Sequence, residues 1–283
     1  MRIGDYVVVS STRTGYLACR GGLLYRLTRC SLDMTQPRAE AVMSALGKAV
    51  KPGSNVLVPD IVEEDDAWYA AVPFRPEVFQ GLPRAYLRCL PEAARRHMIL
   101  LAVSAMDTLA RDGIVHGSLD PDCFRITVTE SGMLGVVLED LRHVGCGRLE
   151  PLESDTESSY AAPEVRRGGK PTTASDAFSL ALCLHEWLAG ELPRCRGNGP
   201  DLTKDSVWLS AAVPVWARGV MADLLNANAA SRPTLTEALT RLAKGDEAAT
   251  VAIYSCESDP EEDADIRTLL LEEDPKLARR YAE

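Results

Sequence analysis

The sequence lacks the features that place a protein in or across a membrane. It holds no run of about 18 apolar residues, and no basic segment followed by an apolar one near its start. These absences predict neither a membrane span nor a signal peptide. We therefore expect a cytoplasmic protein, and we leave a secreted origin open in case Met1 is not the natural start.

Positive charge is scarce as well. The chain has 31 lysines and arginines against 41 aspartates and glutamates, which gives a net charge of -10. A surface of this sign repels phosphate groups, so nucleic acid is not expected as a partner.

Paired cysteines are missing too. The eight cysteines have no short paired spacing, which excludes a zinc knuckle and is typical of reduced thiols. His143 and Cys146 have the spacing of two metal ligands, but a structural zinc site needs four. We expect no metal there.

The hydrophobic content of 46% is enough for one large core or two small ones. In the first 75 residues, alternating patterns separated by glycines predict strands. These predicted strands cover residues 6–9, 15–19, 23–27, 55–59 and 68–74, the last two joined across the acidic residues 63–66. Thr35 is placed to cap a helix with Val42, Leu46 and Val50 on its buried face. This part is predicted to be a five-stranded antiparallel sheet with one helix.

From residue 91 the pattern becomes helical. An apolar stripe runs to Gly113, a residue type that commonly ends helices. Further helices are predicted at residues 175–190, 214–225 and 235–242, the last opened by a capping box of Thr234 and Glu237. The predicted class is α+β, with a sheet part at 1–75, a helical part at 76–243 and an acidic C-terminal extension at 244–283. This extension is read either as solvated chain with one docked segment or as an internal ligand of the helical part.

Five short motifs occur in the order and spacing of protein kinases, and the chain resembles that superfamily over about residues 5–243. The opening residues 3–6 resemble the entry to bacterial eukaryotic-like Ser/Thr kinases. The five motifs are H-G-S-L-D-P at 116–121 for H-R-D-L-K-P, L-E-D-L-R at 138–142 around the D of D-F-G, A-P-E at 162–164, S-D-A-F-S-L at 175–180, and S-R-P-T at 231–234. The resemblance implies a bilobal kinase-like fold with a five-stranded small lobe.

The resemblance assigns structural roles to four residues. It implies that Glu164 pairs with Arg232 inside the helical lobe, and that Asp176 holds the backbone of the catalytic loop. His116 is expected to pack and form hydrogen bonds within that lobe. A buried ion pair is costly to break on one side only, which gives a structural reason for such residues.

The residues that would hold a nucleotide are altered. The glycine-rich loop aligns with Ser10, Thr12 and Gly15, which leaves one glycine of three. Arg26 stands where the family has its strand lysine, with Arg29 as the alternative register. By resemblance, Arg26, its helix partner Glu40 and Asp140 are the candidate cofactor-binding residues, and Asp140 is the one expected metal ligand if a metal binds.

Three catalytic-loop positions differ from the family. Ser118 replaces the general-base aspartate, Cys123 replaces the metal-binding asparagine, and Asp120 replaces a lysine that neutralises the transferred phosphate. We therefore expect no catalytic residues, and we interpret the chain as a pseudokinase that is not an enzyme.

The predicted function is binding. The chain would act as a scaffold or allosteric regulator of a protein partner, for which an active kinase or a signalling complex is the candidate, and no cofactor is expected. The alternative is an unconventional nucleotide-dependent transferase that uses Asp140 with ATP and magnesium or manganese.

Overall fold

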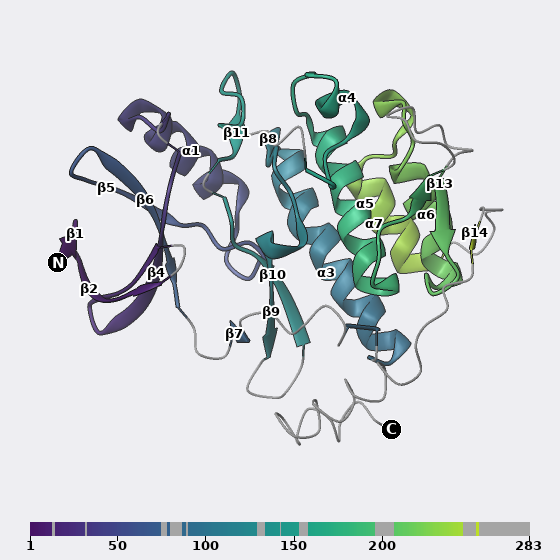
Figure 1. Ribbon diagram of the computed structural model, residues 1–283, viewed down its shortest axis with the longest axis horizontal. Coiled ribbons are helices and arrows are strands. Elements are labelled where there is room, and N and C mark those ends of the chain that lie inside the picture. Colours follow the sequence, from purple (N-terminus) through teal and green to yellow (C-terminus); the bar gives the residue numbers. More distant parts are fainter. Residues whose placement is uncertain are drawn as a thin grey trace.

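The structure is a computed structural model, and it describes most of the chain. The described residues are 1–12, 15–31, 33–74, 78–79, 87–88, 90–128, 134–141, 143–152, 158–195, 207–245 and 253–254. In Figure 1, a sheet formed by the first 75 residues lies at one end of the molecule and a group of helices lies at the other. The chain is thus a mixed α and β protein with a large antiparallel sheet, in agreement with the predicted α+β class.

The strands of the first 73 residues form one antiparallel sheet, which we call the N-terminal sheet. Its spatial order is β1-β2-β3-β4-β6-β5. The strands are β1 (Arg2–Ile3), β2 (Tyr6–Thr12), β3 (Gly15–Arg20), β4 (Leu23–Arg29), β5 (Asp60–Glu64) and β6 (Ala67–Pro73). This sheet has six strands instead of the five predicted, because the short β1 pairs with the start of β2.

The strand predicted at 55–59 is wrong in position, because the strand that pairs with β6 covers residues 60–64. The strand is β5, and it is joined to β6 by a tight turn in which Asp65 and Asp66 have φ angles of 50° and 59°. Such a two-residue turn matches the twist of the flanking strands, so Glu63 and Glu64 belong to the ladder and not to the hairpin tip. Asn55 and Leu57 form backbone hydrogen bonds with Leu138 instead, on either side of the bridge position Val56.

The helix that interrupts the strands is α1 (Gln36–Ala49). Thr35 occupies the N-cap position and Pro37 lies in the first turn, where a proline costs no hydrogen bond. Val42 and Leu46 are buried, as the spacing predicts. These two side chains join the core of the helical part.

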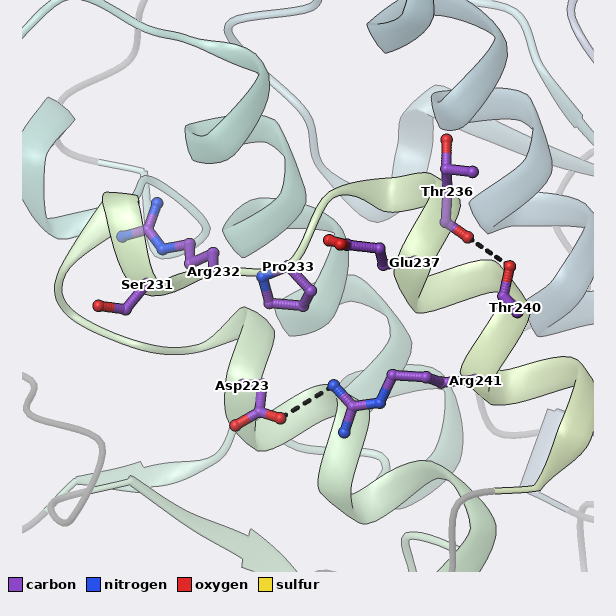
Figure 2. Close-up of a pocket in the computed structure, with 8 residues that line it drawn as sticks. All are labelled: Asp223, Ser231, Arg232, Pro233, Thr236, Glu237, Thr240 and Arg241. Carbon is purple, nitrogen blue, oxygen red and sulfur yellow. Dashed lines mark hydrogen bonds and ion pairs between the residues drawn. The ribbon is translucent and has the colours of Figure 1, made fainter.

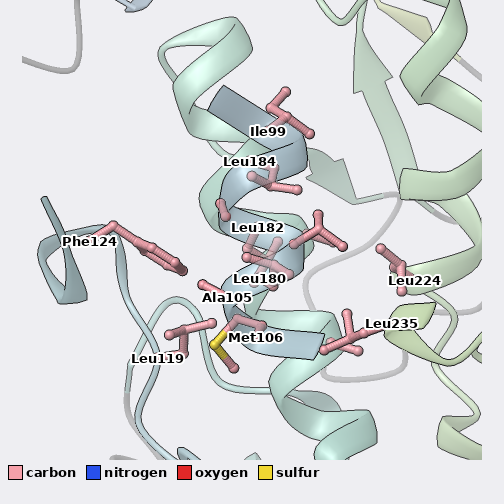
Figure 3. Close-up of a cluster of buried hydrophobic side chains, with 14 of the residues drawn as sticks. Ile99, Ala105, Met106, Leu119, Phe124, Leu180, Leu182, Leu184, Leu224 and Leu235 are labelled. Atoms are coloured by element: carbon pink, nitrogen blue, oxygen red, sulfur yellow. The ribbon is translucent and has the colours of Figure 1, made fainter. Parts of the chain in front are cut away.

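The helical part contains the predicted helices, with ends within a few residues of those expected. They are α3 (Glu92–Arg111), α5 (Thr173–Ala189), α6 (Val215–Leu224) and α7 (Leu235–Lys244), and the short helix α4 (Pro163–Arg166) was not predicted. Helix α5 is buried along nearly its whole length and ends at Gly190, whose φ of 79° suits a residue without a Cβ. The capping box of Thr234 and Glu237 is present. Figure 3 shows side chains of α3 and α5 meeting in the central cluster.

Short strands connect these helices. Between the N-terminal sheet and the helices lies a three-stranded sheet in the order β10-β9-β7. Its strands are β7 (Val78–Phe79), β9 (Phe124–Val128) and β10 (Leu134–Leu138). Two smaller groups are β8 (Ile114–Val115) with β11 (Gly145–Cys146), and β12 (Arg194–Cys195) with β13 (Val207–Ser210) and β14 (Ile253–Tyr254).

Besides a small cluster of Cys30, Met34, Ala39 and Ala70, two larger hydrophobic cores result. The larger runs from α1 through α3, α5 and α6 to α7, while a smaller one lies within the N-terminal sheet around Tyr6, Tyr25 and Leu27. Within the part of the chain that the structure describes, no helix is long and apolar enough to cross a membrane.

Candidate functional site

The segment that resembles a catalytic loop follows β8 and is held from α5. The carboxylate of Asp176, which is 3% exposed, accepts the N–H of His116 at 2.7 Å and the N–H of Gly117 at 2.9 Å. Burial raises the pKa of Asp176, against the effect of His116 and the two N–H groups. The ring Nε2 of His116 lies 2.7 Å from the carbonyl oxygen of Asp140. One chain of contacts therefore connects α5, the loop and the segment that contains Asp140.

Asp120 supports the turn of its own loop. Its Oδ1 accepts the N–H of Asp122 at 2.7 Å and the N–H of Cys123 at 3.2 Å, which caps the short 3₁₀ helix η1 (Pro121–Cys123). A side-chain oxygen that accepts N–H groups at a helix start is a common stabilising cap. Asp120 therefore has a structural role in the described loop.

Cys123 follows directly in this turn. It is 4% exposed, and its thiol lies 3.6 Å from Oδ1 of Asp120 and 3.7 Å from the carbonyl oxygen of Ser118. Burial, together with the negative charges of Asp120 and Asp140, raises the pKa of this thiol well above its usual value. A neutral thiol at this position is a poor ligand for magnesium, which prefers oxygen atoms.

A buried glutamate joins the N-terminal sheet to the rest of the molecule. Arg26 on β4 and Arg125 on β9 both donate to Oε1 of Glu139, which directly precedes Asp140. The glutamate side chain is 6% exposed and each arginine side chain is 22% exposed. We call these three residues the Glu139 bridge. Hydrogen bonds between charged groups are the stronger kind, so this contact fixes β4 relative to β9.

Glu40, which the resemblance pairs with Arg26, lies elsewhere. It is exposed on α1 and accepts a hydrogen bond from Gln36 at 3.0 Å. Helix α1 is tied instead to the segment after Asp140, because Arg38 donates to the carbonyl oxygens of Val144 and Glu150. Sequence reasoning did not find Glu139 as a partner of Arg26, since a glutamate beside an aspartate gives no local sign of burial.

Glu164 and Arg232 are brought together. Two N–H groups of the guanidinium donate to the two carboxylate oxygens at 2.6 and 2.8 Å, and the Arg232 side chain is fully buried. The guanidinium also lies 4.8 Å from the ring centre of Phe178. Burial alone would raise the pKa of Glu164, but the contacts with Arg232 outweigh it and hold the pKa below its ordinary value.

The glycine-rich loop position is only partly described. Ser10 pairs with Leu17 and Thr12 pairs with Gly15 in the ladder of β2 and β3, and residues 13 and 14 lie outside the described residues. A Cβ at Gly15 would collide with the carbonyl oxygen of Leu27 on β4. Close approach of strands therefore accounts for this glycine without any ligand.

A cavity of about 550 Å³ lies between α6 and α7 (Figure 2). Its lining residues fall between Asp223 and Arg241 in the sequence and do not include Asp140. Asp223 and Arg241 form an ion pair at its wall, with 3.0 Å between Oδ2 and Nη1, and Glu237 accepts the N–H of Thr234. Arg232 is held by Glu164. The charged groups of this cavity are thus already paired, and we do not assign it a ligand.

The surroundings of Asp140 do not fit a magnesium–nucleotide complex held by two protein ligands. Asp140 is half-buried, and the position that should supply the second ligand is the neutral thiol of Cys123. Arg26 is engaged by Glu139. The cofactor-binding role of Arg26, Glu40 and Asp140 therefore stays a prediction.

Comparison with known proteins gives two distant, partial matches. No protein-family model matches the chain. Over 128 residues, 42% of this chain, it is 28% identical to Ribosomal protein S6 kinase alpha-2 of Mus musculus. The similarity points to a kinase-like domain. Over 105 residues, 37% of this chain, it is also 29% identical to Rhoptry protein 4 of Toxoplasma gondii.

The matched stretches are 16% and 18% of these two relatives, so the chain matches only a small part of the length of each. The comparison also corrects one prediction. The chain was predicted not to be an enzyme from its altered loop, whereas a relative named as a kinase points to a transferase. Loop residues alone were insufficient because they report on one catalytic mechanism, while the partial similarity covers other parts of the chain as well.

Proposed function

We propose that the chain is a bilobal kinase-like domain that regulates a protein partner by binding it, with an active kinase or a signalling complex as the partner. Its small lobe comprises residues 1–75, its helical lobe residues 76–243, and its C-terminal extension residues 244–283. The Glu139 bridge is the observation that carries this proposal. In the family, phosphoryl transfer depends on a strand lysine paired with a glutamate of the small-lobe helix, whereas Glu40 on α1 contacts Gln36 instead of Arg26. Here one carboxylate occupies both Arg26 and Arg125.

The contacts that fix the shape of the helical lobe support the same role. Asp176 holds the loop backbone, and Glu164 pairs with the fully buried Arg232. A binding surface benefits from such rigidity, because less conformational freedom is lost on association. The net charge of -10 favours a partner with a basic surface, since complementary charge raises the rate of association.

The test uses proximity labelling in the source cells, followed by measurements on each recovered kinase after purification. We expect at least one kinase to bind with a Kd below about 10 μM, on the order of -7 kcal/mol. Its catalytic rate should change when the domain is added, and Asp140→Ala should leave binding intact. If no purified candidate binds or responds, the proposal is wrong.

Nucleotide-dependent transfer is the second candidate function. The relative named as a kinase favours it, and Asp140 stands at the position of the family's metal ligand. The assay is transfer from labelled ATP to a peptide library with magnesium or manganese. Transfer that Asp140→Ala abolishes would support this candidate, and transfer unaffected by Asp140→Ala would exclude a role for that carboxylate.

A further inference from the structure

Strand β13 is paired on both edges, and its two partners come from different parts of the chain. On one edge, β12 pairs with Val207 and Trp208 in antiparallel fashion. On the other edge, β14 pairs in parallel fashion, with Ile253 opposite Leu209 and Tyr254 opposite Ser210. Strand β14 follows α7 in the sequence, and its two residues lie beside β13 of the helical part (Figure 1).

Strand β13 is ordered by contacts that do not involve the extension. Leu209 and Ser210 are fully buried, and the N–H of Ser210 donates to Nε2 of His185 at 3.0 Å. The other ring nitrogen of His185 lies 2.7 Å from the carbonyl oxygen of Glu191. Helix α5 therefore holds β13 in place, and a strand that binds to its edge meets a preformed template.

The edge of such a strand offers backbone N–H and C=O groups to any extended chain. Residues 253 and 254 of the extension pair with this edge. Helix α7 ends at Gly245, whose φ is 81°, and residues 246–252 alone separate Gly245 from β14. A tether of this length spans at most about 25 Å and gives an effective concentration on the order of 1 mM.

We propose that the edge of β13 is a docking site for an extended peptide strand, and that its resident occupant is the segment around Ile253 and Tyr254 of the chain's own extension. The pairing involves two residues, so the occupant is exchangeable. The extension thereby acts as a removable cover over a strand-binding edge. This inference does not depend on the proposed regulatory function.

The test uses the full chain and two matched variants. In the first, Ile253→Pro and Tyr254→Pro together remove both backbone donors of β14. In the second, Ser258→Pro and Ala264→Pro place the same number of prolines beyond it. A labelled peptide with the sequence of residues 248–260 is then titrated into each protein by fluorescence anisotropy.

We expect the peptide to bind the first variant at least about 10-fold more tightly than the wild type, because the tethered copy no longer competes. The second variant should bind it like the wild type. Equal binding to all three proteins would overturn the proposal.

Hydrogen exchange and size measurements complete the test. Residues 207–209 should exchange at least about 10-fold faster in the first variant, while the amide of Ser210 stays protected by His185. Unchanged exchange in this segment would show that the extension does not cover the edge. A wild-type dimer that the first variant dissolves would show that the occupant comes from a second copy, which would overturn the intrachain assignment.

Discussion

Replacing Glu139 by glutamine removes the charge that both Arg26 and Arg125 contact. Breaking a fully buried ion pair on one side costs about 3–5 kcal/mol. Each arginine side chain is 22% exposed, so water compensates part of this loss. We therefore expect Glu139→Gln to lower the free energy of unfolding by about 2 kcal/mol, which is a fall in Tm of roughly 4–8 °C for a protein of this size.

Thermal and urea unfolding followed by circular dichroism measure this change. Lys170→Met is the matched control, because it breaks an exposed pair with Glu150 whose side chains are 76% and 57% exposed. Such surface pairs contribute about 0.5 kcal/mol or less. A double-mutant cycle with Arg26→Met and Glu139→Gln should give a coupling energy above about 1 kcal/mol. If Glu139→Gln costs no more than the control, the bridge does not join the two parts of the molecule.

Other parts of the structure give further predictions. Arg232→Lys should destabilise the chain by about 2–3 kcal/mol in urea unfolding, because an ammonium cannot pair with both oxygens of Glu164; a neutral result would remove the pair as a stabilising contact. Burial lowers the pKa of His185, so the unfolded state binds protons first and stability should fall as pH drops below about 6.5. His185→Gln should flatten this dependence, and an unchanged slope would contradict the assignment. Gly145→Ala should destabilise, because a Cβ there would lie 2.6 Å from backbone atoms, whereas Gly47→Ala in α1 has open space and should stabilise by about 0.5–1 kcal/mol; the opposite order of Tm values would refute this.

Local patterns predicted the elements of the fold well. The apolar stripe of α3 and the capping box of Thr234 act within a few residues, so the sequence alone reveals them. The strand predicted at 55–59 failed for the opposite reason. The segment pairs with Leu138 instead, through the C=O of Asn55 and the N–H of Leu57, a contact that no local pattern indicates.

The candidate site divides in the same way. Glu164 and Arg232 could be paired in advance because the resemblance supplied both positions. Glu139 could not, since its burial depends on Arg26, which lies 113 residues earlier in the chain. From the sequence alone Glu139 is expected to be solvated, and its burial follows only from the contacts with Arg26 and Arg125 in the folded chain. Long-range contacts between charged groups are therefore the part of this site that the sequence did not predict.

If Glu139 keeps Arg26 from contacting phosphate, nucleotide should not stabilise the folded protein. The direct measurement is thermal unfolding of the wild type with ATP or ADP, with and without magnesium or manganese. A ligand stabilises the folded state by RT ln(1 + [L]/Kd), so at a concentration equal to Kd it adds about 0.4 kcal/mol, or roughly 1 °C. We predict a change in Tm below about 1 °C at 5 mM nucleotide. A metal-dependent rise of several degrees that Asp140→Ala abolishes would contradict this account.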